Sequence, residues 1–173
     1  MWQTDSAMIQ SQSFILVSIL SAAFGLARAT TAEPGDASES TAIHELVDRF
    51  DRAVNTKDVK AFGSIFAEDG EFTNPVGMSV KGRTAIEQFH AALFSPSNKP
   101  SFAHAHLRVL DTGIRFIRPD VATVDVKWEQ TGAIAPDGKP WGTRRGILSW
   151  VVARNNGQWS IVVWHNLELP TQQ

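Results

Sequence analysis

The 173-residue sequence contains no cysteine and no tyrosine. Without cysteine, the chain has no disulfide bond, no thiolate nucleophile and no thiolate ligand for a metal. Without tyrosine, no phenol is available as a general acid or as a hydrogen-bond donor to an oxyanion. These two absences exclude several classes of catalytic mechanism before the fold is considered.

The sequence also lacks a concentration of charge of one sign. Its 16 Lys and Arg residues and 18 Asp and Glu residues are interspersed, and the formal net charge is -2. No basic patch is present that would neutralise a row of phosphates, so nucleic acid is not an expected partner. A content of 43% hydrophobic and 20% charged residues is typical of a globular protein with one core.

The N-terminal segment has the pattern of an export signal. An uncharged apolar run over residues 13–26 precedes Ala27-Arg28-Ala29, which has small residues at the positions a signal peptidase reads. The run is shorter than the roughly 20 residues a membrane-spanning helix needs, so no stable membrane anchor is predicted. The segment before it departs from the usual pattern because it has Asp5 and no Lys or Arg. We predict a signal peptide over residues 1–29, a disordered leader over 30–39, and a secreted or periplasmic mature protein.

Helical periodicity dominates the next part of the chain. Apolar residues recur every three or four positions after residue 40, which predicts a first helix capped at residue 40 or 41. Asp58 predicts the cap of a second helix that ends at Glu68-Asp69-Gly70. Thr84 and Glu87 form a capping-box pattern that predicts a third helix, with His90 on its buried face as a hydrogen-bonded core residue.

After Pro100 the apolar pattern becomes strand-like. Apolar and polar residues alternate over 122–129, and residues 144–154 are apolar on both faces, as in a central strand. Asn155-Asn156-Gly157 predicts a tight hairpin turn, and a short strand pair is expected around Phe72 and Val80. The expected fold is an α+β domain over residues 40–170, in which N-terminal helices close over a curved antiparallel sheet.

The order of several motifs resembles the nuclear transport factor 2-like superfamily. The motifs are Asn55-Thr56-Lys57-Asp58, residues 65–70, Asn74-Pro75-Val76-Gly77, Trp128-Glu129, residues 157–161 and His165-Asn166. The likeness covers residues 41–169 and is greatest to the SgcJ/EcaC branch, which is close to SnoaL-like cyclases and to ketosteroid isomerase. It implies a cone-shaped fold, an apolar pocket at the wide end, and a homodimer formed through the outer face of the sheet.

The isomerase activity of these relatives does not carry over. Ketosteroid isomerases use an Asp before Pro-Val-Gly as the base, a Tyr on the first helix and a protonated Asp on a late strand. The matching positions here are Asn74, Phe50 and Ser149. An amide is not a useful base near neutral pH, so this mechanism is not expected.

The resemblance also implies which residues face the pocket. The predicted substrate-binding residues are Phe50, Asn74, Trp128, Arg145, Ser149, Trp164 and Asn166. A pocket of this kind suits a small apolar or aromatic molecule. Filling of the core is the alternative for the apolar positions, among them Val124, Val126 and Val151. Asn166 and His165 are neighbours on a strand, so they point to opposite faces, and Asn166 is assigned to the pocket.

Three titratable residues are candidates for acid–base catalysis. Asp51 lies on the flank of the first helix and can orient an imidazole, but it can equally be a solvated charge. His104 and His106 share a strand face, where they can act as base and donor or as two metal ligands. Leu107 and Val109 on the opposite face indicate instead that both histidines point outward. No third ligand is evident, so neither a metal nor another cofactor is predicted.

Two functions remain open from the sequence alone. The first is an exported pocket protein that catalyses lyase, cyclase or isomerase chemistry without a cofactor. The second is a non-catalytic ligand-binding or dimeric scaffold module that has kept the fold. A titratable group inside the cavity favours the enzyme, and a cavity lined only by Asn, Ser and Trp favours the binding module.

Overall fold

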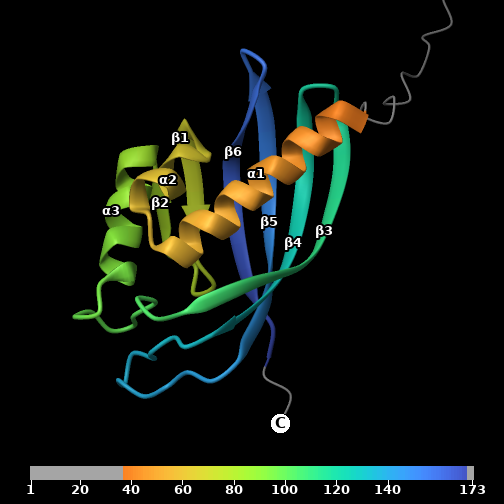
Figure 1. Ribbon diagram of the computed structural model, residues 1–173. Coiled ribbons are helices and arrows are strands. Elements are labelled where there is room, and N and C mark those ends of the chain that lie inside the picture. Colours follow the sequence, from red (N-terminus) through yellow and green to blue (C-terminus); the bar gives the residue numbers. More distant parts are fainter. Residues whose placement is uncertain (1–36, 171–173) are drawn as a thin grey trace, which may run out of the picture. The chain divides into compact units, whose positions relative to one another are not determined.

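The computed structural model describes residues 37–170, which form an α+β domain (Figure 1). Its elements in chain order are α1 (Ala37–Thr56), α2 (Val59–Ser64), β1 (Phe66–Thr73), β2 (Ser79–Lys81), α3 (Arg83–Phe94), β3 (His106–Arg118), β4 (Val121–Thr131), β5 (Arg144–Asn155) and β6 (Gln158–Glu168). The helices come first and the long strands follow. The predicted α+β class is therefore confirmed.

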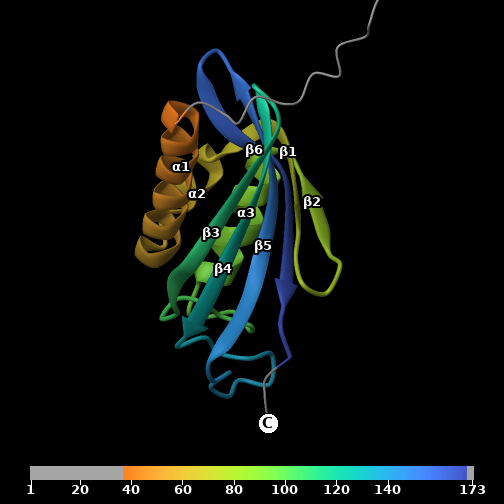
Figure 2. The ribbon, with the colours of Figure 1, turned by 90° about the vertical axis from the view of Figure 1, so that its right-hand side faces the viewer.

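The strands form one curved, open sheet in the order β2-β1-β6-β5-β4-β3. All neighbours are antiparallel except β1 and β6, which run parallel. In Figure 1, α1 crosses one face of the sheet, and in Figure 2 the strands lie in front of α3. The helices thus cover the concave face, as predicted, and the one parallel pairing is the departure from the expected antiparallel sheet.

The core lies between α1 and the inner face of the sheet. The apolar stripe of α1 is buried along its whole length, from Ile43 to Val54. Phe50, in the middle of this stripe, packs edge-on against Trp150 of β5 and Trp164 of β6, with ring centroids 5.4 and 5.2 Å apart. Burial of this stripe is what fixes α1 on the sheet, since a helix in isolation gains little stability from propensity alone.

The first helix begins earlier than the sequence predicted. It starts at Ala37, inside the segment expected to be a disordered leader. Glu39 explains the difference, because its carboxylate pairs with Arg154 of β5 and accepts a hydrogen bond from Nε1 of Trp159 at 2.7 Å. This contact across more than a hundred residues holds the first turn, and no local pattern signals it.

The predicted ends of α2 and the start of α3 also need correction. Asp58 caps α2 as expected, with Oδ1 accepting from the Ala61 amide. However, α2 ends at Ser64, and residues 68–70 belong to β1, which pairs with β6 on both sides of them, at Phe66 and at Glu71. Gly82 precedes α3 without a side-chain cap, and Glu87 instead forms an ion pair with Lys60, so the capping-box prediction is wrong.

The predicted turns of the sheet are confirmed. Phe72 lies opposite Val80 in the short β1–β2 hairpin. Asn156 and Gly157 have φ values of 51° and 78° between β5 and β6, which is the left-handed pair that a two-residue hairpin turn needs. β5 lies between β4 and β6, as expected for a strand that is apolar on both faces.

The predicted signal peptide over residues 1–29 lies outside the described residues, as does most of the predicted leader. Export and a secreted or periplasmic location therefore stay predictions. Among residues 37–170, no helix is long and apolar enough to cross a membrane.

The absence of a side chain at Gly146 leaves room for the ring of Trp128 to lie across β5, and a substitution at Gly146 tests this packing. The two residues are directly opposite in the β4–β5 pair. A Cβ at Gly146 would collide with the Leu167 carbonyl oxygen and would lie 2.5 Å from Cζ2 of Trp128. We expect Gly146→Ala to lower the free energy of unfolding in urea by about 1–3 kcal/mol, because the inserted methyl group overpacks the site.

Gly113 of β3 is the matched control, since nothing lies within 4 Å of a Cβ built there. Gly113→Ala should leave the free energy of unfolding unchanged or raise it by up to about 1 kcal/mol. Equal losses in the two variants would contradict this description of Trp128.

Candidate functional site

The main cavity of the domain has a volume of ≈ 410 Å³ and lies between the inner face of the sheet and α1, α2 and α3. The segments before β3 and before β5 also contribute to its wall. Nine aromatic side chains line it, namely Phe50, Phe62, Phe72, Phe89, Phe94, Phe102, Trp128, Trp141 and Trp164. Its volume lies within the range of small-molecule sites, about 300–1,000 Å³.

Five of the predicted substrate-binding residues line this cavity: Phe50, Asn74, Trp128, Trp164 and Asn166. They come from α1, the β1–β2 turn, β4 and β6, so the fold brings together positions far apart in sequence. Val124 and Val126 are fully buried in the core. For these two valines the alternative of core packing is the one observed.

Arg145 and Ser149 do not face the cavity, so their prediction as pocket residues is wrong. Arg145 donates hydrogen bonds to Glu129 at 2.9 and 2.6 Å on the outer face of the sheet. Ser149 donates to Asp125 at 2.6 Å on the same face. The predicted alternation of β5 is shifted by one residue. Because β5 carries apolar residues on both faces, its sequence does not show which residues face inward.

Arg144 takes the place predicted for Arg145. Its side chain is 6% exposed, and its Nε and Nη2 donate to the two carboxylate oxygens of Glu168 at 2.6 and 2.5 Å. Nη1 donates to Gln130 at 3.0 Å, and the guanidinium lies 3.9 Å from the centre of the Trp141 ring. This bidentate ion pair neutralises the arginine inside the cavity wall and fixes its orientation.

Several buried polar atoms beside the cavity have no partner. Trp128 Nε1, Trp164 Nε1 and Asn166 Oδ1 are buried without a hydrogen bond from the described part of the chain. An unpaired buried polar group costs about 1–3 kcal/mol. Asn74 differs, because its Oδ1 accepts from the Val76 and Met78 amides and so stabilises the turn.

His90 of α3 is a titratable residue in the cavity wall. Its Nδ1 lies 2.8 Å from the Ile86 carbonyl oxygen, which can only accept, so Nδ1 carries the proton and Nε2 is the acceptor. Burial lowers the pKa of His90 to about 4, so the ring is neutral at pH 7. Four phenylalanine rings surround it, with Phe62 closest at 4.0 Å between centroids. The sequence predicted the hydrogen-bonded core role but not the position beside a cavity.

The three predicted catalytic residues lie elsewhere. Asp51 and His106 line a separate groove of ≈ 270 Å³ between α1 and β3. Burial raises the pKa of Asp51, and the nearby charge of His106 opposes this shift. Asn55 donates to Asp51 at 3.1 Å and also bonds both backbone groups of Leu107, so it holds α1 against the edge of the sheet.

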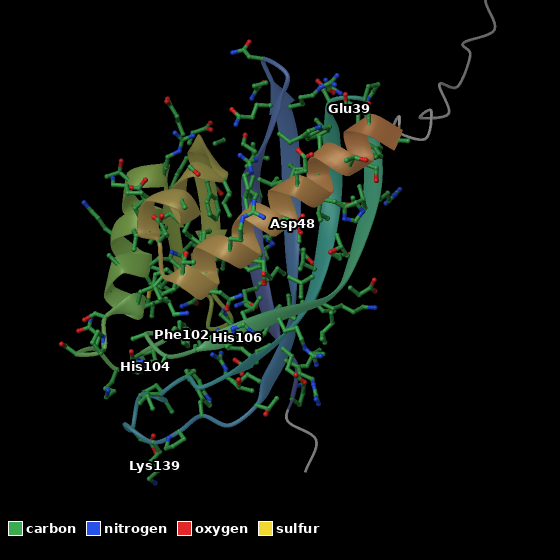
Figure 3. The ribbon with its side chains drawn as sticks, viewed as in Figure 1. Glu39, Asp48, Phe102, His104, His106 and Lys139 are labelled. Carbon is green, nitrogen blue, oxygen red and sulfur yellow. The ribbon has the colours of Figure 1, made fainter. Side chains whose placement is uncertain are left out.

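His104 and His106 point outward, in agreement with the alternative drawn from Leu107 and Val109. Both are exposed, and Figure 3 shows His104 just before β3 and His106 at its start, with Asp48 on α1. Neither lines the main cavity. Among residues 37–170, no group of three or more His, Asp or Glu side chains is placed to hold a metal ion.

The chain matches the family model of the SnoaL-like domain over residues 36–165. Among proteins of curated function, none matches this chain. The structural comparisons therefore supply the remaining relatives.

Three solved structures illustrate the likeness. An uncharacterised protein with a cystatin-like fold from Caulobacter vibrioides is 26% identical, with a TM-score of 0.70, over 78% of this chain and 92% of that one. An NTF2-like protein from Novosphingobium aromaticivorans is 21% identical, with a TM-score of 0.61, over 78% and 84% of the two chains. A protein from the same species, provisionally named a scytalone dehydratase, is 16% identical, with a TM-score of 0.64, over 77% and 85%. The nuclear transport factor 2-like fold is thereby confirmed.

The buried imidazole of His90 predicts a specific dependence of stability on pH. Because the folded-state pKa, about 4, is below the ordinary value of about 6.5, the unfolded chain binds the proton more readily. Stability is therefore full above about pH 6.5 and falls as the pH decreases toward about 4. When the pH is lowered from 7 to 5, the free energy of unfolding of the wild type should fall by about 2 kcal/mol more than that of His90→Phe.

Urea unfolding at the two pH values measures this difference. His104→Phe, which removes an exposed imidazole, is the control and should follow the wild type. A pH dependence that is the same in the wild type and in His90→Phe would show that His90 is not buried in its neutral form.

Proposed function

Because this chain belongs to the SnoaL-like domain family, we propose that it binds a small, flat aromatic molecule in the main cavity. The observation that carries the proposal is the set of nine aromatic side chains around ≈ 410 Å³. Such walls offer stacked and edge-on contacts to a flat ring. A structural neighbour provisionally named an aromatic ring hydroxylase, 20% identical to this chain, is in keeping with a ligand of this class.

The polar atoms beside the cavity support a ligand with at least one polar substituent. Asn166 Oδ1 can accept a hydrogen bond, and the indole nitrogens of Trp128 and Trp164 can donate one. A ligand that pairs with them recovers the free energy lost by burying them unpaired. A purely hydrocarbon ligand would leave that cost in place.

Acid–base catalysis is the second candidate function, and His90 is the observation in its favour. Its Nε2 is held as an acceptor by the bond from Nδ1 to Ile86. It can take a proton from a bound substrate and return it at another position, as lyase, cyclase or isomerase chemistry without a cofactor requires. Asp51, His104 and His106 lie outside the cavity, so His90 replaces them as the acid–base candidate.

A homodimer through the outer face of the sheet is a further part of the proposal. On the outer face of β5 and β6, Ile147 lies opposite Leu167 and Val151 lies opposite Val163, and Leu167 is 56% exposed. Exposed apolar side chains that adjoin one another indicate a contact surface. The outer face of β3 and β4 carries ion pairs instead, such as that of Lys127 with Asp111.

Binding of 2-naphthol and of naphthalene tests the aromatic cavity. The wild type should bind both compounds. The Asn166→Leu substitution should lower the affinity for 2-naphthol by about tenfold and leave the affinity for naphthalene unchanged, because only the hydroxyl group loses a hydrogen-bond partner. Equilibrium dialysis measures both affinities. His165→Leu, on the opposite face of the same strand and exposed, is the matched control and should bind as the wild type does. A wild type that binds neither compound would refute the proposal.

The oligomeric state of Leu167→Glu tests the dimer. We expect sedimentation equilibrium to show a dimer for the wild type and a monomer for this variant, since a carboxylate would be buried without a partner. Ile117→Glu changes a residue of β3 with similar exposure, 49%, and should remain dimeric. A monomeric wild type would contradict the proposed interface.

A further inference from the structure

The charges of the side chains that line the main cavity do not sum to zero. Its charged residues are Lys57, Arg144 and Glu168, and His90 is neutral because burial lowers its pKa to about 4. Arg144 and Glu168 form a bidentate ion pair and neutralise each other. Among the described residues of the wall, one positive charge, that of Lys57, is therefore left without a counter-charge.

Lys57 is held by carbonyl oxygens and not by a carboxylate. Its Nζ donates to the carbonyl oxygens of Ala105 at 2.6 Å, Val54 at 2.8 Å and Asn55 at 3.4 Å. An ammonium group has three N–H donors, one for each of these acceptors. No ion pair within residues 37–170 includes Lys57. The third hydrogen bond is the longest, so this N–H is the one a ligand can take over most readily.

Capping of α1 does not by itself require a lysine at this position. Lys57 follows the last residue of α1 with a φ of 60°. This left-handed conformation favours glycine and costs other residues about 1–2 kcal/mol. A glycine would end the helix with less strain, but it would remove the charge that is uncompensated among the described residues of the cavity wall.

The position of Lys57 beside the phenylalanine rings determines the orientation of an anionic ligand in the cavity. Its Nζ is 5.9 Å from the centre of the Phe94 ring, and Phe94 packs edge-on against Phe62 at 6.2 Å. An anionic group at Nζ would therefore place its attached ring against these phenylalanines. A carboxylate fits best, because it is compact and ionised at neutral pH, whereas a phenol is not.

We propose that the cavity selects an aromatic monocarboxylate and that Lys57 is the residue that recognises its carboxylate. This inference rests on the proposed function, since it names the class of molecule that the same cavity takes. A single positive charge matches a monoanion, and the carbonyl oxygens around Nζ keep the ammonium in place before the ligand binds. Arg144 contributes no net attraction because Glu168 already pairs with it.

Calorimetric titration with 2-naphthoate and 2-naphthamide, two probes of nearly the same shape, tests the proposal. The wild type should bind the anion about tenfold or more tightly than the amide, as a charge-assisted hydrogen bond to a buried site allows. Lys57→Met should lose this preference by weakening 2-naphthoate alone. Lys57→Arg, which retains the charge, should keep a preference for the anion.

Lys60→Met is the matched control, because Lys60 lies three residues further on with a side chain that is 85% exposed. It should bind both probes as the wild type does. If circular dichroism shows that Lys57→Met does not fold, Lys57→Gly takes its place, since glycine suits the left-handed backbone.

The outcomes separate the two proposals. Equal binding of the two probes by the wild type would overturn the role of Lys57 and leave the aromatic cavity intact. So would an anion preference that survives in Lys57→Met. A wild type that binds neither probe would overturn the proposed function itself.

Discussion

Packing around Trp164 is the contact on which the rest of the structure depends. Its ring touches those of Phe50 on α1, Phe62 on α2 and Trp150 on β5, with centroids 5.0–5.8 Å apart. These rings bring two helices and the centre of the sheet to one point. Because Trp164 is 3% exposed and also lines the cavity, the same side chain completes the core and forms a wall of the site.

The cavity begins where this aromatic packing ends. Beyond Trp164 the sheet carries Asn166 and Glu168 at the next inward positions of β6, and polar groups replace apolar ones. Arg144 is tolerated there because Glu168 and Gln130 satisfy its donors and Trp141 covers its face. The cavity is therefore aromatic along its walls, with its charged groups held in fixed positions.

Much of this fold could be predicted from the sequence, because local patterns determine it. The stripe of α1, the cap at Asp58 and the turn at Asn156 each depend on residues close together in the chain. The features that were missed depend on distant partners. Glu39 extends α1 through Arg154 and Trp159, and pairing with β6 turns the end of α2 into a strand.

The candidate site was predicted only in part, and β5 shows why. Trp128, Trp164 and Asn166, which the family resemblance assigned to the pocket, do line the cavity. In β5, both faces are apolar, so alternation could not tell Arg144 from Arg145. The inward face is marked by Gly146, which lies opposite Trp128 and leaves room for its ring.

The roles of Lys57 and His90 could not be read from the sequence. Lys57 follows a helix end and His90 lies on an apolar helix face, and both are ordinary structural positions. Only the cavity that the tertiary fold builds beside them makes them candidates for function. Asp51 and His106 lie together in a different groove.

The indole N–H resonances of the protein, followed by nuclear magnetic resonance during addition of 2-naphthol, test the central claim most directly. The chain has six tryptophans, which report on different parts of the structure. If the aromatic cavity is the binding site, the resonances of Trp128 and Trp164 shift, while that of Trp159, bonded to Glu39, does not. Saturating 2-naphthol that leaves Trp128 and Trp164 unchanged would contradict the account.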